Sequence, residues 1–168
     1  MITLVVANQK GGVGKTTTAL NLAASLSAAS RKVLLIDLDS QGNSTSGTGE
    51  EKNEASHSLI DILLNEGFPI EKAIEQTKYK FDLIPASVDL ISAEIELGSL
   101  PNPTSLLKNK LANMQASYDY VVIDCPPSLG MISVSALRAA SKVLIPLQCE
   151  YYSFCLLYTS DAADDVYC

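Results

Sequence analysis

The sequence predicts an α/β fold in which helices cover both faces of a mostly parallel sheet, and three observations lead to this prediction. Short apolar runs alternate with helical segments, as a parallel sheet with crossover helices requires. The first apolar run leads through a glycine-rich segment, residues 10–17, into an Ala- and Leu-rich stretch. Two later runs end in aspartates. With 168 residues, 47% hydrophobic, a single domain is the default expectation.

The apolar runs predict strands at residues 2–7, 33–38, 81–84, 120–124 and 143–147. The last two runs are almost continuous in apolar residues, which favours central parallel strands that are covered on both faces.

The segments between these strands predict helices at residues 16–29, 57–66, 70–76, 88–98, 104–116 and 130–140. The first of them has an apolar stripe at helical spacing that can pack on the sheet. Residues 40–56 are rich in Gly, Ser, Thr and Asn and have little to bury, so they predict a mobile surface loop. A plain linker is the alternative interpretation of that composition.

Residues 10–17 read Lys-Gly-Gly-Val-Gly-Lys-Thr-Thr and carry the strongest chemical signal. A strand that runs through a glycine turn into a helix leaves several backbone N–H groups pointing at one small volume, which fits an anion. Lys15 can reach the outer phosphates of a nucleotide, and the Thr16 hydroxyl can ligate Mg²⁺. Gln9 stands where the strict pattern G-x-x-x-x-G-K-[ST] requires glycine. A turn that binds nothing is the alternative, and the positions of the glycines, Lys15 and Thr16 argue against it.

Carboxylates end two of the predicted strands. Asp37 and Asp39 occupy alternate positions at the end of strand 33–38, so we expect them to face the same side. Ligands of open parallel sheets bind beyond the carboxyl ends of the strands, which places this end beside the glycine-rich loop. Acidic residues there can hold Mg²⁺-bound water or orient an attacking water, although alone they also fit solvated turn formers.

Asp124 follows four apolar or aromatic residues, which is the Walker B pattern. We expect it to bind Mg²⁺ through water. The rigid turn at Pro126 and Pro127 comes next and leads a loop whose position can report a γ-phosphate.

Charge and composition limit the functional classes. A net charge of −7 argues against a broadly basic surface for nucleic acid. The apolar runs are too short to span a bilayer and no basic segment precedes a long apolar core at the N-terminus, so we expect a cytosolic protein without a membrane partner. His57, the single histidine, is expected to be exposed or at a helix start. The cysteines form no C-x-x-C pair, which favours reduced thiols over a metal site or disulfides; they are Cys125, Cys149, Cys155 and Cys168.

Residues 10–17 resemble the deviant Walker A loop of the ParA/MinD class of ATPases, and the chain as a whole resembles the ParA/Soj family of chromosome- and plasmid-partitioning ATPases. The similarity runs from Met1 to about Tyr152. The segments that carry it are residues 37–43, 83–90, 124–128 and 147–152. MinD is similar at the loop, but Gln-Gly-Asn after Asp39 and the Gln-Cys-Glu-Tyr-Tyr run fit ParA/Soj better. Nitrogenase-iron-protein-like relatives share the loop, yet the cysteines here lack a cluster arrangement.

The resemblance implies a P-loop NTPase fold that uses ATP and Mg²⁺ in the cytoplasm, on the nucleoid in the family. It implies an ATP-dependent sandwich homodimer in which Lys10 reaches the partner's nucleotide, nonspecific DNA binding by the full-length ATP state, and stimulation by a ParB-type partner. Lys15 would bind the outer phosphates, and Asp39 would position the hydrolytic water. Asp37 would have a structural role or would support the residues that contact the ligand. The metal would be supported by Thr16, Asp39 and Asp124. The nucleotide cradle would be Gly11, Gly12, Val13, Gly14, Lys15, Thr16 and Thr17.

Two departures from the family pattern affect these expectations. Ser40 replaces a proline that usually follows the second aspartate, which can loosen the first switch without removing a catalytic group. Residues 153–168 do not continue the family pattern, so we expect an N-terminal part of the ATPase domain at 1–152, an atypical tail at 153–168, and no C-terminal part with adenine contacts, dimer surface and basic DNA-binding residues. A truncated nonenzymatic nucleotide-binding module, a MinD-like positioning ATPase and a phosphate-transferring metabolic enzyme remain as alternatives, the last without an acceptor-binding constellation.

Overall fold

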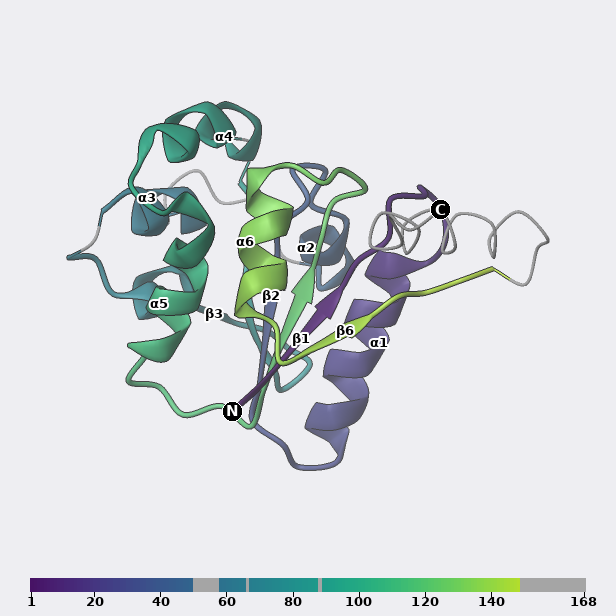
Figure 1. Ribbon diagram of the computed structural model, residues 1–168. Coiled ribbons are helices and arrows are strands. Elements are labelled where there is room, and N and C mark those ends of the chain that lie inside the picture. Colours follow the sequence, from purple (N-terminus) through teal and green to yellow (C-terminus); the bar gives the residue numbers. More distant parts are fainter. Residues whose placement is uncertain (50–57, 66, 88, 149–168) are drawn as a thin grey trace, which may run out of the picture.

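The computed structural model describes residues 1–49, 58–65, 67–87 and 89–148, which form a six-stranded sheet between two layers of helices (Figure 1). The strand order is β3-β4-β2-β5-β1-β6, and all neighbours are parallel except β3 and β4. The strands are β1 (Ile2–Val6), β2 (Val33–Asp37), β3 (Glu75–Gln76), β4 (Asp82–Ile84), β5 (Tyr120–Asp124) and β6 (Lys142–Leu144). The predicted α/β class with a mostly parallel sheet is therefore confirmed.

The register brings the carboxyl ends of the three central strands to one edge of the sheet. Asp124 at the end of β5 lies between Val6 of β1 and Asp37 of β2. The segments that follow these strands therefore leave the sheet side by side, as expected for ligand sites in open parallel sheets.

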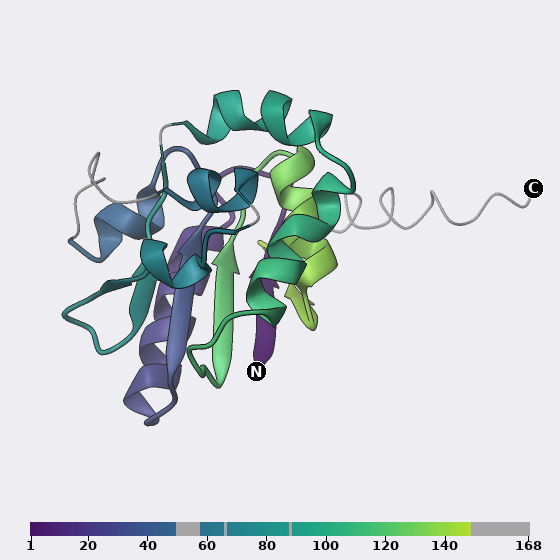
Figure 2. The ribbon, with the colours of Figure 1, turned by 90° about the vertical axis from the view of Figure 1, so that its left-hand side faces the viewer.

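Helices lie on both sides of the strands in Figure 1, and a quarter turn of the molecule shows the strands side by side (Figure 2). One face is covered by α1 (Lys15–Ala28), whose Ala19 and Ala23 pack against Leu35 and Val122. The opposite face carries α3 (Leu59–Leu64), α4 (Leu90–Ser99), α5 (Leu106–Ala112) and α6 (Met131–Ala139). Successive strand residues alternate between the two cores because side chains of a strand point to opposite faces. None of the helices in the described part of the chain is long and apolar enough to cross a membrane.

Two predicted helices differ from the structure. The helix predicted at 70–76 is a 3₁₀ turn, η1 (Ile70–Ala73), followed by β3, which pairs antiparallel with β4. Residues 75–76 form a strand because they pair with the edge strand β4. Local propensity does not include such a tertiary contact. The helix predicted at 104–116 is a second 3₁₀ turn, η2 (Pro103–Ser105), and then α5, which ends at Ala112.

The predicted loop at 40–56 is wrong where the structure describes it. Residues Asn43–Gly47 form a short helix, α2, at the carboxyl ends of the strands (Figure 1). Ser44, Thr45 and Thr48 are all fully buried. The hydroxyls of Ser44 and Thr45 donate to strand-end aspartates and that of Thr48 donates to the carbonyl oxygen of Thr45, which compensates their burial. A composition-based prediction cannot anticipate such partners. Residues 50–57, including His57, lie outside the described part of the chain.

The prediction of a central strand at 143–147 is also wrong within the described residues. β6 (Lys142–Leu144) is shorter than the predicted strand. It pairs with β1 alone and is the last strand of the sheet that the described residues form. Val143 and Ile145 are each 47% exposed. A run of apolar residues shows that a strand has surface to bury, but it does not specify how many neighbouring strands are present.

Candidate functional site

The glycine-rich loop joins β1 to α1, and the space beside its glycines is open. Gly12 and Gly14 have φ angles of 74° and 89°, a left-handed conformation that favours glycine, and Gly14 caps the N-terminus of α1. A Cβ atom added at Gly11, Gly12 or Gly14 would meet no heavy atom within 4 Å. The first N–H groups of α1 thus adjoin a space that an anionic ligand can enter, and the helix dipole favours negative charge there.

Lys15 begins α1 and is buried, with only 7% of its surface exposed. Its ammonium group donates a hydrogen bond of 3.1 Å to the carbonyl oxygen of Lys10. The loop backbone therefore curves around the ammonium group of Lys15. An ammonium in this position can bind phosphate oxygens as a point charge.

Asp124 lies at the end of β5 and is 1% exposed. Its Oδ2 accepts a 2.7 Å hydrogen bond from the Ser44 hydroxyl, whereas Oδ1 has no hydrogen-bond partner in the described structure. Burial raises the pKa of Asp124, while the hydroxyls of Ser44 and Thr16 and the charge of Lys15 lower it and the charge of Asp39 raises it. The structure therefore brings Lys15, Thr16, Asp39 and Asp124 into one electrostatic cluster.

Asp39 follows β2 in a tight turn and is 8% exposed. Its Oδ1 accepts a hydrogen bond from the N–H of Gln41 at 3.0 Å, and its own N–H donates to Asp37 Oδ1 at 3.1 Å. The turn closes with a bond of 2.8 Å from the Gly42 N–H to the Asp39 carbonyl. The Gln41 N–H thus holds the carboxylate within this turn, at the same edge of the sheet as Asp124.

Asp37 holds α2 in place. Its Oδ2 accepts two hydrogen bonds of 2.8 Å, from the N–H and the hydroxyl of Thr45. Burial raises the pKa of Asp37 to about 6, although the bonds from Thr45 lower it. Asp37 therefore connects strand β2 to the helix that also reaches Asp124.

Lys10 contacts the segment that follows β6. Its N–H donates to Asn8 Oδ1 at 2.9 Å, and its ammonium donates to Gln148 Oε1 at 3.1 Å. The amide nitrogen of Gln148 donates in turn to the carbonyl oxygen of Gly12 at 3.3 Å. The side chain of Lys10 thus contacts its own chain in this single-chain structure.

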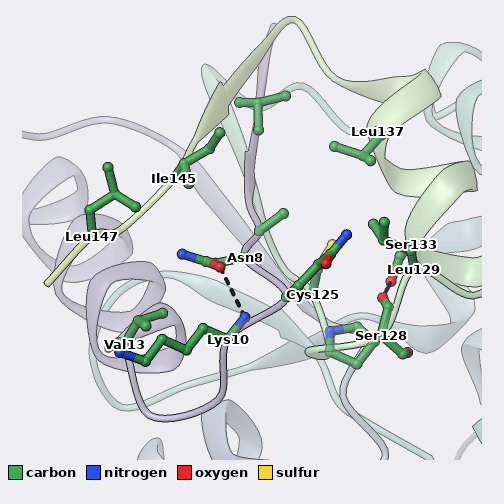
Figure 3. Close-up of a pocket in the computed structure, with 14 residues that line it drawn as sticks. Asn8, Lys10, Val13, Cys125, Ser128, Leu129, Ser133, Leu137, Ile145 and Leu147 are labelled. Atoms are coloured by element: carbon green, nitrogen blue, oxygen red, sulfur yellow. Dashed lines mark hydrogen bonds between the residues drawn. The ribbon is translucent and has the colours of Figure 1, made fainter. Parts of the chain in front are cut away.

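A cavity of about 300 Å³ adjoins the loop, and Figure 3 shows its lining from the segments that follow β1, β5 and β6 and from α6. Leu129, Leu137, Ile145 and Leu147 make most of it apolar, and Lys10 borders it. Cys125 also lines it, and burial raises the pKa of its thiol to about 12. The thiol is therefore protonated at neutral pH and is no nucleophile.

Sequence reasoning missed Ser44, Thr45 and Gln148 as members of this region. Ser44 and Thr45 fall in a polar segment whose composition indicates exposure, and Gln148 is 138 residues from Lys10. The usable signal was the pair of strand-end aspartates, because buried carboxylates need donors from somewhere in the fold. Among the described residues, no group of three or more His, Cys, Asp and Glu side chains could hold a metal ion by itself. The other three cysteines lie outside that part of the chain.

Known proteins match this chain over most of its length. A family model described as an AAA domain matches residues 1–157. The chromosome partitioning protein ParA of Myxococcus xanthus is 48% identical over 151 residues, and the sporulation initiation inhibitor protein Soj of Bacillus subtilis is 46% identical over 150 residues. Each match covers 89% of this chain. The chain belongs to the ParA/Soj family of partitioning ATPases, and it matches the AAA domain model as well.

The ParA/Soj assignment agrees with the fold. A crystal structure of cobyrinic acid a,c-diamide synthase from Mycobacterium smegmatis, with bound ATP analog and magnesium, superposes with a TM-score of 0.86 at 38% identity. That match covers 98% of this chain and 69% of the synthase. The chain spans 53% of the M. xanthus ParA and 59% of the B. subtilis Soj, so it covers less than two thirds of these relatives.

Proposed function

We propose that this chain binds ATP with Mg²⁺ and hydrolyses it as part of a ParA/Soj-type partitioning protein. The observation that carries the proposal is the open glycine loop at the N-terminus of α1, with buried Lys15 beside it and an unpartnered oxygen of Asp124 close by. These are the parts that phosphate binding and a metal site require. The magnesium and ATP analog bound to the M. smegmatis structure support this choice of ligands.

Each residue of the site receives a role in this proposal. The backbone of residues 11–17 would cradle the phosphates, and Lys15 would bind the outer ones. Thr16 and Asp124 would hold Mg²⁺, directly and through water, which suits the oxygen ligands that this cation prefers. Asp39 would support the metal and position the attacking water. Bound Mg²⁺ would neutralise charge on the phosphates during hydrolysis.

The finer expectations of the family belong to this proposal as well. They are an ATP-dependent homodimer in which Lys10 reaches across, nonspecific DNA binding, stimulation by a ParB-type protein, and a cytoplasmic location on the nucleoid. They come from the family resemblance, and the name of the M. xanthus relative, a chromosome partitioning protein, supports the partitioning role alone. Because the net charge is −7, any DNA contact would need a local basic patch or further sequence. A boundary near residue 152 between the ATPase domain and a distinct tail also stays a prediction.

Nucleotide binding by a Lys15→Ala variant tests the proposal. The lost charged hydrogen bonds are worth about 1.5–3 kcal/mol, which corresponds to a drop in ATP affinity of roughly 10- to 150-fold. Isothermal titration calorimetry measures this drop directly. Lys32→Ala is the matched control, because Lys32 is an exposed lysine immediately before β2, and it should leave the affinity unchanged.

Unchanged ATP affinity in Lys15→Ala would remove the basis for assigning this loop. Phosphate release by the unsubstituted protein separates an ATPase from the alternative, a nonenzymatic nucleotide-binding module. Tight ATP binding without phosphate release would support the second of these.

A further inference from the structure

Two neighbouring side chains of α2 reach two different strand ends. Thr45 bonds to Asp37 at the end of β2, and Ser44 bonds to Asp124 at the end of β5. The helix therefore lies across adjacent strands at the edge where the glycine loop also leaves the sheet.

The Thr45 contacts fix the position of α2. Its N–H and hydroxyl both donate to Asp37, and its hydroxyl oxygen accepts a hydrogen bond of 2.9 Å from the N–H of Ala86 after β4. All three bonds are buried. A side chain that is satisfied on every side and excluded from water leaves the helix little freedom to shift.

Ser44 then orients Asp124. Its side chain has no exposed surface, and its hydroxyl donates to Asp124 Oδ2 over 2.7 Å, the length of a strong hydrogen bond to an ionised group. This bond uses one carboxylate oxygen and leaves Oδ1 buried without a partner. A buried carboxylate oxygen of this kind is costly unless a cation or a donor meets it.

We propose that Ser44 is a positioning residue for the metal site: by holding Oδ2 of Asp124, it directs Oδ1 toward the Mg²⁺ that accompanies the nucleotide. This inference rests on the proposed function, because it assumes that a nucleotide and a divalent cation bind beside Thr16. It adds a residue that contacts neither the nucleotide nor the metal and that acts through Asp124.

The experiment measures Mn²⁺ binding to the protein saturated with ADP, by electron paramagnetic resonance of the free Mn²⁺. Partners that orient metal ligands typically change metal affinity by about 10- to 100-fold, so Ser44→Ala should weaken Mn²⁺ binding by that factor. The affinity for ADP without metal, measured in EDTA with a fluorescent analogue, should stay unchanged, because Ser44 acts on the metal ligand alone. Ser46→Ala is the matched control, since Ser46 lies exposed on the same helix.

Three comparisons decide the outcome. In an Asp124→Asn background, Ser44→Ala should cause no further loss of Mn²⁺ affinity, and Ser44→Thr, which keeps the hydroxyl, should restore binding. Mn²⁺ affinity in Ser44→Ala equal to that of the unsubstituted protein would overturn the inference, and so would an equal loss of metal-free ADP affinity, which indicates a general structural role. If Ser44→Ala does not fold by circular dichroism, Ser44→Cys, a weaker donor of similar size, takes its place under the same criteria. Failure of the unsubstituted protein to bind ADP would instead overturn the proposed function.

Discussion

Replacing Thr45 by valine removes one buried hydroxyl while keeping a side chain of similar size. Thr45 is fully buried in α2. Its hydroxyl donates to Asp37 Oδ2 at 2.8 Å and accepts from the N–H of Ala86 at 2.9 Å. The substitution therefore removes two hydrogen bonds and introduces no large cavity, so the change in stability reports mainly on the polar contacts.

The expected loss in the free energy of unfolding follows from these two bonds. A hydrogen bond to a charged group contributes about 1.5–3 kcal/mol, and a buried N–H without an acceptor costs about 1–3 kcal/mol. Because the bonds share one oxygen, the two contributions are not additive, and we expect a total loss of about 2–5 kcal/mol. This is a large share of the roughly 5–15 kcal/mol that stabilises a typical domain.

Urea unfolding followed by circular dichroism measures this loss, with Ser46→Ala as the control on the exposed face of the same helix. A decrease below about 0.5 kcal/mol, the range of ordinary surface substitutions, would refute the reasoning. It would mean that Ala86 and Asp37 find other partners and that α2 is not held by Thr45.

The pH dependence provides an independent check on the same network. The pKa of Asp37 is raised from 3.8 to about 6 by burial, so ionisation of Asp37 lowers the free energy of unfolding as the pH rises through that interval. The Thr45 hydroxyl lowers this pKa, so Thr45→Val should raise it further. The stability difference between the two proteins should therefore be smaller at about pH 5 than at about pH 7.5. A difference that shrinks toward the higher pH would contradict this account.

Two further predictions concern the proposed dimer and the periphery of the fold. In a protein with the full length of its relatives, Lys10→Ala should keep ATP binding and lose most hydrolysis, because a cation supplied by a partner stabilises transition-state charge as an arginine finger does. Mixing Lys10→Ala with Asp39→Ala should restore part of the phosphate release, and no recovery in verified heterodimers would exclude a role in trans. Burial acts to raise the pKa of Glu71, but backbone N–H donors, those of Gln115 and Ala116 among them, bring it below 4.5. Glu71→Gln should therefore reduce the free energy of unfolding slightly at neutral pH, an effect that disappears as acid protonates Glu71; thermal melts at both pH values measure it, and an equal effect at both would argue against this contact.

Local patterns in the sequence were sufficient for the glycine loop and the strands around it. The period of the apolar residues, the glycines at 12 and 14, and the aspartates at the ends of two strands are all patterns of a few neighbouring residues. Parallel strands have their carboxyl ends at the same edge, so the sequence predicts that the end of strand 33–38 lies beside the glycine loop. The register adds that Asp37 is paired with Asp124. The α/β class and the candidate cluster around Lys15, Thr16, Asp39 and Asp124 followed from these local rules.

The tertiary structure alone decided the elements whose stability depends on distant partners. β3 forms because β4 offers an edge, and β6 lies at the side of β1 rather than in the middle of the sheet. Ser44 can be buried in a helix because Asp124, 80 residues away in the sequence, accepts a hydrogen bond from its hydroxyl. Lys10 likewise donates a hydrogen bond to Gln148, 138 residues away. The energy of burying a polar side chain changes sign with the presence of a partner, and only the folded chain brings that partner within hydrogen-bond distance.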